Sequence, residues 1–305
     1  MVSDDTEHAC FAAQALVRSQ GDLERFERQL GRSLVWWLLG FPAGIGLATL
    51  KATLRLCAGF APRQSGVFSA GNGPAMRSPI IGLALGHSPA ELRSFVQGST
   101  RITHTDPKAF YGALAVALAA YQSAAGGVVS STRFLDELAS LLAPEPAEDF
   151  LELIRKAAAS AAAGEPVSVF AAAIGSRHGV SGYMYHTVPC VLQVWLRHPD
   201  DFEQGLREML AAGGDTDTTG AILGAILGAR AGKAGIPESW LRGIAEWPRS
   251  MGWVERLGGA VAAAGAADAD AVPSPGYFVP AIPVRNLVFT LTVLAHGFRR
   301  LAPPY

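Results

Sequence analysis

Two clusters of short, oxygen-bearing side chains give the first indication of chemistry. One is Ser3-Asp4-Asp5-Thr6-Glu7, and the other is the Gly-Gly-Asp-Thr-Asp-Thr-Thr-Gly run at 213–220; each directly precedes a predicted helix. Asp215 and Asp217 are two residues apart, and in an extended segment such side chains point to the same side. Crowded carboxylates repel each other unless a proton or a cation lies between them. The pattern therefore favours a cation site.

The ligand types indicate which cation would bind. Carboxylates and hydroxyls with no Cys or His nearby favour Mg²⁺, Mn²⁺ or Ca²⁺ over Zn²⁺. If the clusters meet in space, they supply four negative charges, which suits two divalent ions a few ångströms apart. The carboxylates concerned are Asp4, Asp5, Asp215 and Asp217.

Helix capping is the alternative interpretation of both clusters. Ser and Asp side chains accept hydrogen bonds from the free N–H groups of a first helical turn, and Asp4-x-x-Glu7 suggests a capping box. Capping explains the first cluster better than the second, since one capping residue suffices for one helix. Asp215 and Asp217 therefore remain the stronger indication of a cation.

A third candidate element is Ser69-Ala70-Gly71-Asn72-Gly73. A Gly-rich turn with exposed N–H groups before a helix can bind an anion. Asn-Gly pairs are also typical of ordinary turns, so an anion site and a plain turn both stay open. Two further candidates are His104 and the Gly182-Tyr183 pair, although a lone His or Tyr is more often a core residue.

The elements that must position these groups are predicted to be helices. Apolar residues recur with helical spacing, alanine is abundant, and runs of alternating β-branched residues are nearly absent. We predict an all-α fold, a compact single-domain multi-helix bundle over residues 1–305. The expected helices include 110–121, 134–142, 150–163, 167–174, 188–196, 202–210 and 287–298.

A helix after the second cluster carries glycine at every fourth position, at Gly220, Gly224, Gly228 and Gly232. A glycine inside a helix costs about 1 kcal/mol relative to alanine. The stripe therefore predicts a central helix that its neighbours approach closely.

Composition excludes several classes of function. Half of the residues are apolar, 17% are charged and the formal net charge is −1, so no nucleic-acid or membrane partner is expected. The uncharged stretch Leu34–Leu50 approaches the length of a bilayer span, but Pro42 and its glycines interrupt it. We predict a buried helix ending near Leu39 and a second helix through Leu56. Three scattered cysteines and an acidic start favour a cytoplasmic protein.

Together these segments resemble the ADP-ribosylglycohydrolase family, which includes dinitrogenase reductase-activating glycohydrolase. The matching strings are SDDTEHACFAAQAL at 3–16, SAGNGPAMRSPIIGLAL at 69–85, THTDP at 103–107, 182–232 with its GGDTDT, and IPESWL at 237–242. The strings follow the family's order and cover most of the chain.

The resemblance implies a hydrolase with two Mg²⁺ ions (Mn²⁺ being possible) that removes ADP-ribose from an Arg, a Ser or another acceptor of a modified protein or small conjugate. The implied metal ligands are Ser3, Asp4, Asp5, Asp215, Asp217 and Thr218. The implied substrate-binding residues are Ser69, Gly71, Asn72 and Gly73 for the diphosphate and ribose, with His104, Gly182 and Tyr183. Asp5 and Asp217 are the expected catalytic carboxylates.

One departure from the family concerns the N-terminus. Family members carry a helix and a Gly/Asp-rich loop ahead of the SDD motif, whereas this sequence begins two residues before Ser3. The expectation is that this helix and loop are missing, through a late start or a shortened variant. A protein that binds ADP-ribose or a related nucleotide without turnover is therefore the alternative, and a helical interaction protein whose clusters are only caps is a third.

Overall fold

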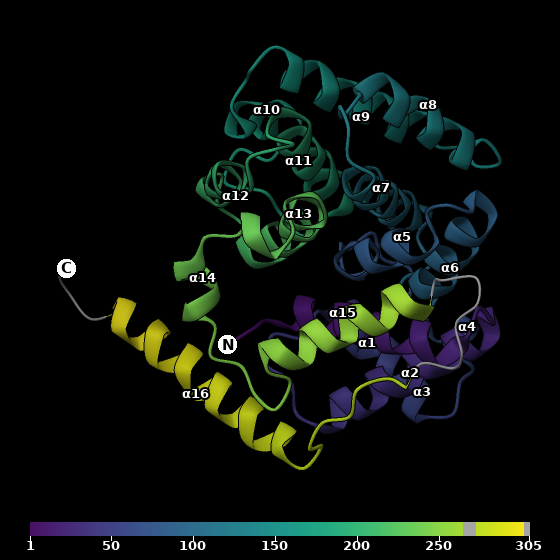
Figure 1. The fold of residues 1–305 in the computed structure, drawn as a ribbon, viewed down its shortest axis with the longest axis vertical. Coiled ribbons are helices and arrows are strands. Elements are labelled where there is room, and N and C mark those ends of the chain that lie inside the picture. The colour runs from purple at the N-terminus through teal and green to yellow at the C-terminus, as the bar shows by residue number, and fades with distance from the viewer. Residues whose placement is uncertain (265–272, 302–305) are drawn as a thin grey trace.

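The computed structural model describes residues 1–264 and 273–301, and in this part the regular secondary structure is entirely helical (Figure 1). Pairing between extended segments is limited here to three isolated bridges, with no strand, so the all-α prediction is confirmed. The α-helices are α1 Asp4–Ser19, α2 Leu23–Leu39, α3 Leu47–Cys57, α4 Pro62–Ser65, α5 Pro79–Leu85, α6 Pro89–Arg101, α7 Pro107–Ala124, α8 Ser131–Leu142, α9 Glu148–Ala162, α10 Val167–Ala173, α11 Met184–Arg197, α12 Phe202–Ala211, α13 Thr216–Ala231, α14 Glu238–Gly243, α15 Met251–Ala264 and α16 Ala281–Leu301.

Helix α7 forms the centre of the core and is packed by α5, α6, α11 and α13. Most of its residues are fully buried, and many are alanines, whose small side chains allow close helix packing. The approach is closest at Gly82 of α5, where an added Cβ would lie 1.9 Å from the carbonyl oxygen of Ala117. A glycine is therefore required where α5 crosses α7.

The glycine stripe of α13 differs in part from its prediction. Its glycines receive side chains of α12: a Cβ on Gly220 would lie 3.2 Å from Leu210 and one on Gly224 3.8 Å from Leu206. Only Gly220 is in tight contact, because 3.8 Å is an ordinary van der Waals distance. The predicted central helix is confirmed, since α13 packs against α7, α11 and α12, but along the glycine stripe the contact is tight only at Gly220.

Helix α1 lies between α2 and α15 and carries the first acidic cluster at its start. One of its faces packs on α15 through a small apolar cluster separate from the main core. This cluster consists of Cys10, Ala13, Val17, Trp253, Leu257, Ala260 and Val261. The first turn of α1 is thus carried on a helix that is packed along its length.

The stretch Leu34–Leu50 is divided as predicted, since α2 ends at Leu39 and α3 begins at Leu47. It is less buried than predicted: Trp36 and Phe41 are exposed, with 69% and 80% of their surface accessible. Burial is confined to the side that faces the core.

One helix among the described residues, α16, has the length and mean hydropathy of a helix that could cross a membrane, over Ala281–Arg299. Within that window, 17% of the residues are buried. Figure 1 shows α16 along the edge of the molecule. Ile282, Arg285 and Asn286 are its buried side chains near the start.

Candidate functional site

The two acidic clusters meet where α1 and α13 begin. Asp4 and Asp5 open α1, and Asp217 and Thr218 lie in the first turn of α13. Burial raises the pKa of Asp4 to about 7, and the neighbouring carboxylates of Asp5 and Asp217 add to this shift. The fold therefore brings together residues that are more than two hundred positions apart in sequence.

Asp5 is the most buried carboxylate of the group, with 1% of its surface exposed. Its Oδ2 accepts a hydrogen bond from the hydroxyl of Ser3 at 2.7 Å, whereas its Oδ1 is buried and has no hydrogen-bond partner among the described residues. Burial raises the pKa of Asp5, while the hydroxyls of Ser3 and Thr218 lower it. Since a buried polar atom without a partner is costly, Oδ1 is suited to a cation.

Asp215 precedes α13 and is oriented by Asn72. The Asn72 amide Nδ2 donates to Asp215 Oδ2 at 2.7 Å and to the Thr187 hydroxyl at 3.0 Å. Burial raises the pKa of Asp215, as does the adjacent Asp217 carboxylate, and the Asn72 amide opposes this shift.

The structure corrects two details of the sequence interpretation. Asp217 already lies within the helix, so the pair does not belong to one extended segment, although the two carboxylates are neighbours. Capping does not account for the clusters either, because neither Ser3 nor Asp215 makes a side-chain cap hydrogen bond. The Glu7 carboxylate binds Trp37 and Arg249 rather than the first turn of α1.

The donor set fits a hard divalent cation. Across residues 1–264 and 273–301, no group of three or more Asp, Glu, His or Cys side chains is gathered that could hold a metal. Mg²⁺ is commonly held by one or two carboxylates together with waters and substrate oxygens, so it does not require such a cage. The unpartnered Asp5 Oδ1, with the Ser3 and Thr218 hydroxyls nearby, meets this lesser requirement.

The Ser69–Gly73 loop is fastened to the Gly182-Tyr183 segment. The N–H of Asn72 donates to the Gly182 carbonyl at 3.0 Å, and the N–H of Met184 donates to the Ala70 carbonyl at 2.8 Å. A Cβ added to Gly182 would lie 3.1 Å from Asp215 Oδ2. Loop, Gly182 segment and second acidic cluster therefore form one continuous surface.

His104 supports the loop and is neutral. A Cβ on Gly71 would lie 3.1 Å from its Nε2, and one on Gly73 would lie 3.2 Å from its Cε1, so side chains larger than hydrogen would press on the ring. Burial, followed by the charge of Arg77, lowers the pKa of His104 to about 3. The ring Nδ1 lies 2.8 Å from the Thr103 hydroxyl.

Arg77 is a functional candidate that the sequence interpretation missed. It is fully buried, and its guanidinium donates to the Gly73 carbonyl at 3.2 Å, the Thr103 hydroxyl at 2.7 Å and Ser99. These acceptors are neutral, and in the described part of the chain no carboxylate pairs with it. Burial lowers its pKa to about 9. An uncompensated positive charge thus lies against the Ser69–Gly73 loop, and the only sequence signal was an arginine within a largely apolar segment.

Tyr183 has a cationic neighbour that was also missed. The Lys108 ammonium donates to the Tyr183 hydroxyl at 3.1 Å and lies 5.1 Å from the ring centre of Tyr185. No ion pair involves Lys108 in residues 1–264 and 273–301. Its position directly after the THTDP string could have suggested it.

Comparisons with known proteins agree with this architecture. The family model described as ADP-ribosylglycohydrolase matches residues 1–270. An uncharacterized protein of Archaeoglobus fulgidus is 32% identical over 245 residues, which are 79% of this chain and 75% of that protein. The ADP-ribosyl-[dinitrogen reductase] glycohydrolase of Rhodospirillum rubrum is 28% identical over 79% of this chain and 72% of its own length.

Two further matches extend the comparison. ADP-ribosylhydrolase ARH3 of Mus musculus is 30% identical over 58% of this chain, and the match spans about half (53%) of the mouse protein. A solved ADP-ribosylglycohydrolase-related protein complex has a TM-score of 0.58 and 25% identity, covering 87% of this chain and 81% of that chain. Since the family model matches most of its length, the chain belongs to the ADP-ribosylglycohydrolase family.

Proposed function

We propose that this protein is a Mg²⁺-dependent hydrolase that cleaves the glycosidic bond between ADP-ribose and a modified Arg or Ser side chain, or a related small conjugate. Family membership supports the coarser statement, hydrolysis of an ADP-ribose linkage. The observation that carries the finer proposal is the buried Asp5 Oδ1, which has no hydrogen-bond partner among the described residues and lies beside Thr218 and Asp217.

The surface next to the acidic clusters suits a dinucleotide-like anion. The diphosphate would bind at the Ser69–Gly73 loop, where no carboxylate of residues 1–264 and 273–301 pairs with the buried charge of Arg77. If the Thr103 hydroxyl donates to Nδ1 of His104, the ring proton is on Nε2, which faces Gly71 and can donate to a phosphate oxygen. The aromatic ring of Tyr183 would flank the adenine end, with the Lys108 ammonium beside it.

The acidic clusters would act at the other end of the substrate. When bound there, divalent ions orient vicinal hydroxyls and lower the pKa of water. Asp4, Asp5, Asp215 and Asp217 would hold the ions with Ser3 and Thr218, and Asn72 would orient Asp215. In hydrolysis the water oxygen bonds to the anomeric carbon as the bond to the acceptor breaks. We assign proton removal from this water to Asp5 or Asp217, after which the acceptor takes up the proton.

The test measures free ADP-ribose released from Arg-modified and Ser-modified proteins, with Mg²⁺ and with a chelator. We expect release only with the ion, and a loss of about a hundredfold or more for Asp215→Asn. The matched control is Asp200→Asn, an exposed carboxylate paired with Arg230 away from both clusters; its rate should equal that of the wild type.

Two results would contradict the proposal. Equal rates in chelator and in Mg²⁺ would refute the cation requirement. If calorimetry detects ADP-ribose binding but neither modified protein releases ADP-ribose, the alternative is favoured, a nucleotide-binding protein without turnover.

The cytoplasmic location of the protein stays a prediction.

A further inference from the structure

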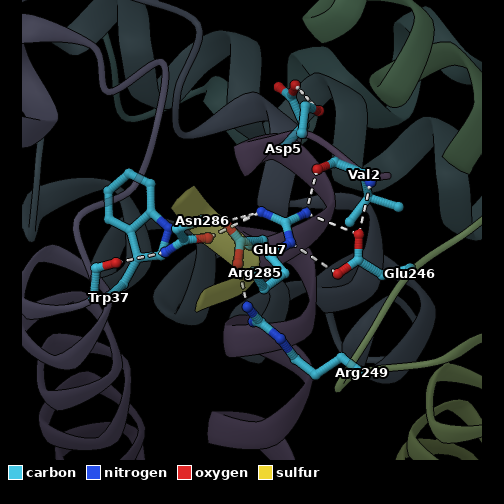
Figure 2. A network of polar contacts seen from close by, with 10 residues as sticks. Val2, Asp5, Glu7, Trp37, Glu246, Arg249, Arg285 and Asn286 are labelled. Carbon is cyan, nitrogen blue, oxygen red and sulfur yellow. Dashed lines mark hydrogen bonds and ion pairs between the residues drawn. The ribbon is translucent and has the colours of Figure 1, made fainter. Parts of the chain in front are cut away.

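A buried cluster of charges surrounds Glu7 on α1, on a face of the helix that points away from Asp5 (Figure 2). Glu7 follows Asp5 by two positions, so the two side chains project about 200° apart around the helix. Glu7 accepts a hydrogen bond from Trp37 Nε1 at 2.9 Å and pairs with Arg249. Arg285 Nη1 lies 3.8 Å from the same carboxylate. The first turn of α1 is thereby fixed from the face that does not bear Asp5.

The cluster also holds the backbone that leads into α1. Arg285 Nη2 donates to the Val2 carbonyl at 2.6 Å, and the N–H of Val2 donates to Glu246 Oε2 at 2.8 Å. Arg285 and Glu246 bind each other through two hydrogen bonds, at 2.8 and 2.9 Å, and their side chains are only 2% and 3% exposed. Val2 is therefore bonded on both its N–H and its carbonyl by one buried ion pair.

These bonds matter because no side-chain cap hydrogen bond fixes the position of the first residues of α1. Ser3 stands at the cap position, but its hydroxyl donates to Asp5 Oδ2. Val2 is the residue directly before Ser3, so a bond to Val2 fixes the direction from which Ser3, Asp4 and Asp5 enter the site.

One of the two side chains that bind Val2 lies outside the residues matched by the family model. The matched model ends at residue 270, whereas Arg285 is on α16, which begins at Ala281. Helix α16 is itself held to the end of α2, because Asn286 Nδ2 donates to the Gly40 carbonyl at 2.7 Å. This bond holds the start of α16, from which Arg285 reaches Val2, against the end of α2.

We propose that Arg285 and Glu246 are positioning residues that hold Val2, and through it keep Ser3, Asp4 and Asp5 in the geometry that binds divalent ions. The role rests on the proposed function, because it assumes that the first cluster binds metal. Arg285 and Glu246 contact neither the metal-binding side chains nor the substrate, and they act through the backbone of Val2. Metal affinity, rather than the chemical step, is the quantity that they control.

The test is the double variant Arg285→Met with Glu246→Leu, compared with wild type by calorimetric titration of Mn²⁺ alone. Removing both partners leaves neither of the two as a buried, unpaired charge, so the fold should be retained. We expect the Mn²⁺ dissociation constant to rise about tenfold or more, amide exchange at residues 3–6 to accelerate, and kcat at saturating Mn²⁺ to stay within threefold.

The matched control is Arg93→Met with Glu145→Leu. Arg93 also joins a carboxylate to a backbone carbonyl, that of Leu141 at 2.8 Å, but away from α1. This variant should lose thermal stability and keep the wild-type Mn²⁺ affinity. Arg285→Lys retains the buried charge but lacks the planar set of guanidinium N–H donors, so its Mn²⁺ dissociation constant should lie between those of the wild type and the double variant. This single variant decides the question if the double variant fails to fold.

Three results would overturn the role. The first is a folded double variant with wild-type Mn²⁺ affinity and wild-type exchange at residues 3–6, and the second is Arg285→Lys with both properties unchanged. The third is a wild-type chain that binds no Mn²⁺, which would refute the proposed function and this role with it. In the first two cases, ADP-ribose release by the wild type would leave the proposed function standing.

Discussion

If the proposed function holds, replacing Asn72 by leucine should weaken Mg²⁺ binding without unfolding the protein. The Asn72 amide is the hydrogen-bond donor that the structure places on Asp215 Oδ2, at 2.7 Å. A hydrogen bond to a charged group contributes about 1.5–3 kcal/mol, which corresponds to a factor of roughly 10 to 150 in an equilibrium constant. The loss of this bond appears as a raised pKa of Asp215, because the Asn72 amide lowers that pKa. A carboxylate that is harder to ionise binds a cation more weakly.

The assay is ADP-ribose release as a function of Mg²⁺ concentration. For Asn72→Leu we expect the half-saturating Mg²⁺ concentration to rise by about tenfold or more. The control is Thr187→Val, which removes the other acceptor of the Asn72 amide, at 3.0 Å, and leaves the bond to Asp215; its half-saturating concentration should change by less than threefold. A Mg²⁺ dependence for Asn72→Leu that matches the wild type would refute the assignment of Asn72 as the group that orients Asp215.

Three further outcomes follow from single contacts and charges. Gly82→Ala places a carbon 1.9 Å from the Ala117 carbonyl oxygen and should lower the free energy of unfolding by about 3 kcal/mol or more. In the control Gly258→Ala the added Cβ meets no atom within 4 Å, so the free energy of unfolding should rise by about 1 kcal/mol; similar urea midpoints for the two variants would disprove this. His8 is buried, neither of its ring nitrogens has a hydrogen-bond partner in the described part of the chain, and burial holds its pKa well below 6.5. Below pH 6.5 only the unfolded chain takes up a proton on His8, so the free energy of unfolding falls by up to about 1.4 kcal/mol per pH unit as the pH is lowered. His8→Phe should abolish this fall, measured by urea unfolding at pH 7.5 and 5.0, and an unchanged pH dependence would contradict the assignment. The folded-state pKa of Asp4, about 7, is above its unfolded value of 3.8, so the metal-free chain loses stability as pH rises from 4 through 7. Mg²⁺ should therefore raise Tm more at pH 8 than at pH 5.5, and equal shifts at the two pH values would count against a cation at Asp4.

Helical periodicity located several elements to within a few residues. The predicted segments 202–210 and 167–174 correspond to α12 and α10, because each has an apolar face of helical spacing that packs on the core. Helices α5 and α15 were not among the predicted segments. The first has only seven residues and the second is rich in alanine and glycine, so neither shows a strong alternation of polar and apolar faces.

The acidic clusters could be recognised because several carboxylates and hydroxyls gather within a few residues of each other. Their partners could not be recognised in this way. Asn72 reaches Asp215 across 143 positions, and Arg285 reaches Val2 across 283, without any local pattern that marks either residue. Contacts of this kind are set by how the helices pack, and a single sequence records only the residue types.

The buried guanidinium of Arg77 has a practical consequence for work with this protein. A buried positive charge whose acceptors among the described residues are all neutral is stabilised by any small anion that can reach its vicinity. Phosphate or sulfate in a buffer should accordingly raise the melting temperature of the ligand-free protein and slow substrate turnover at the same concentrations. Rates measured in chloride and in phosphate are therefore not interchangeable, and kinetic comparisons between variants need one fixed anion.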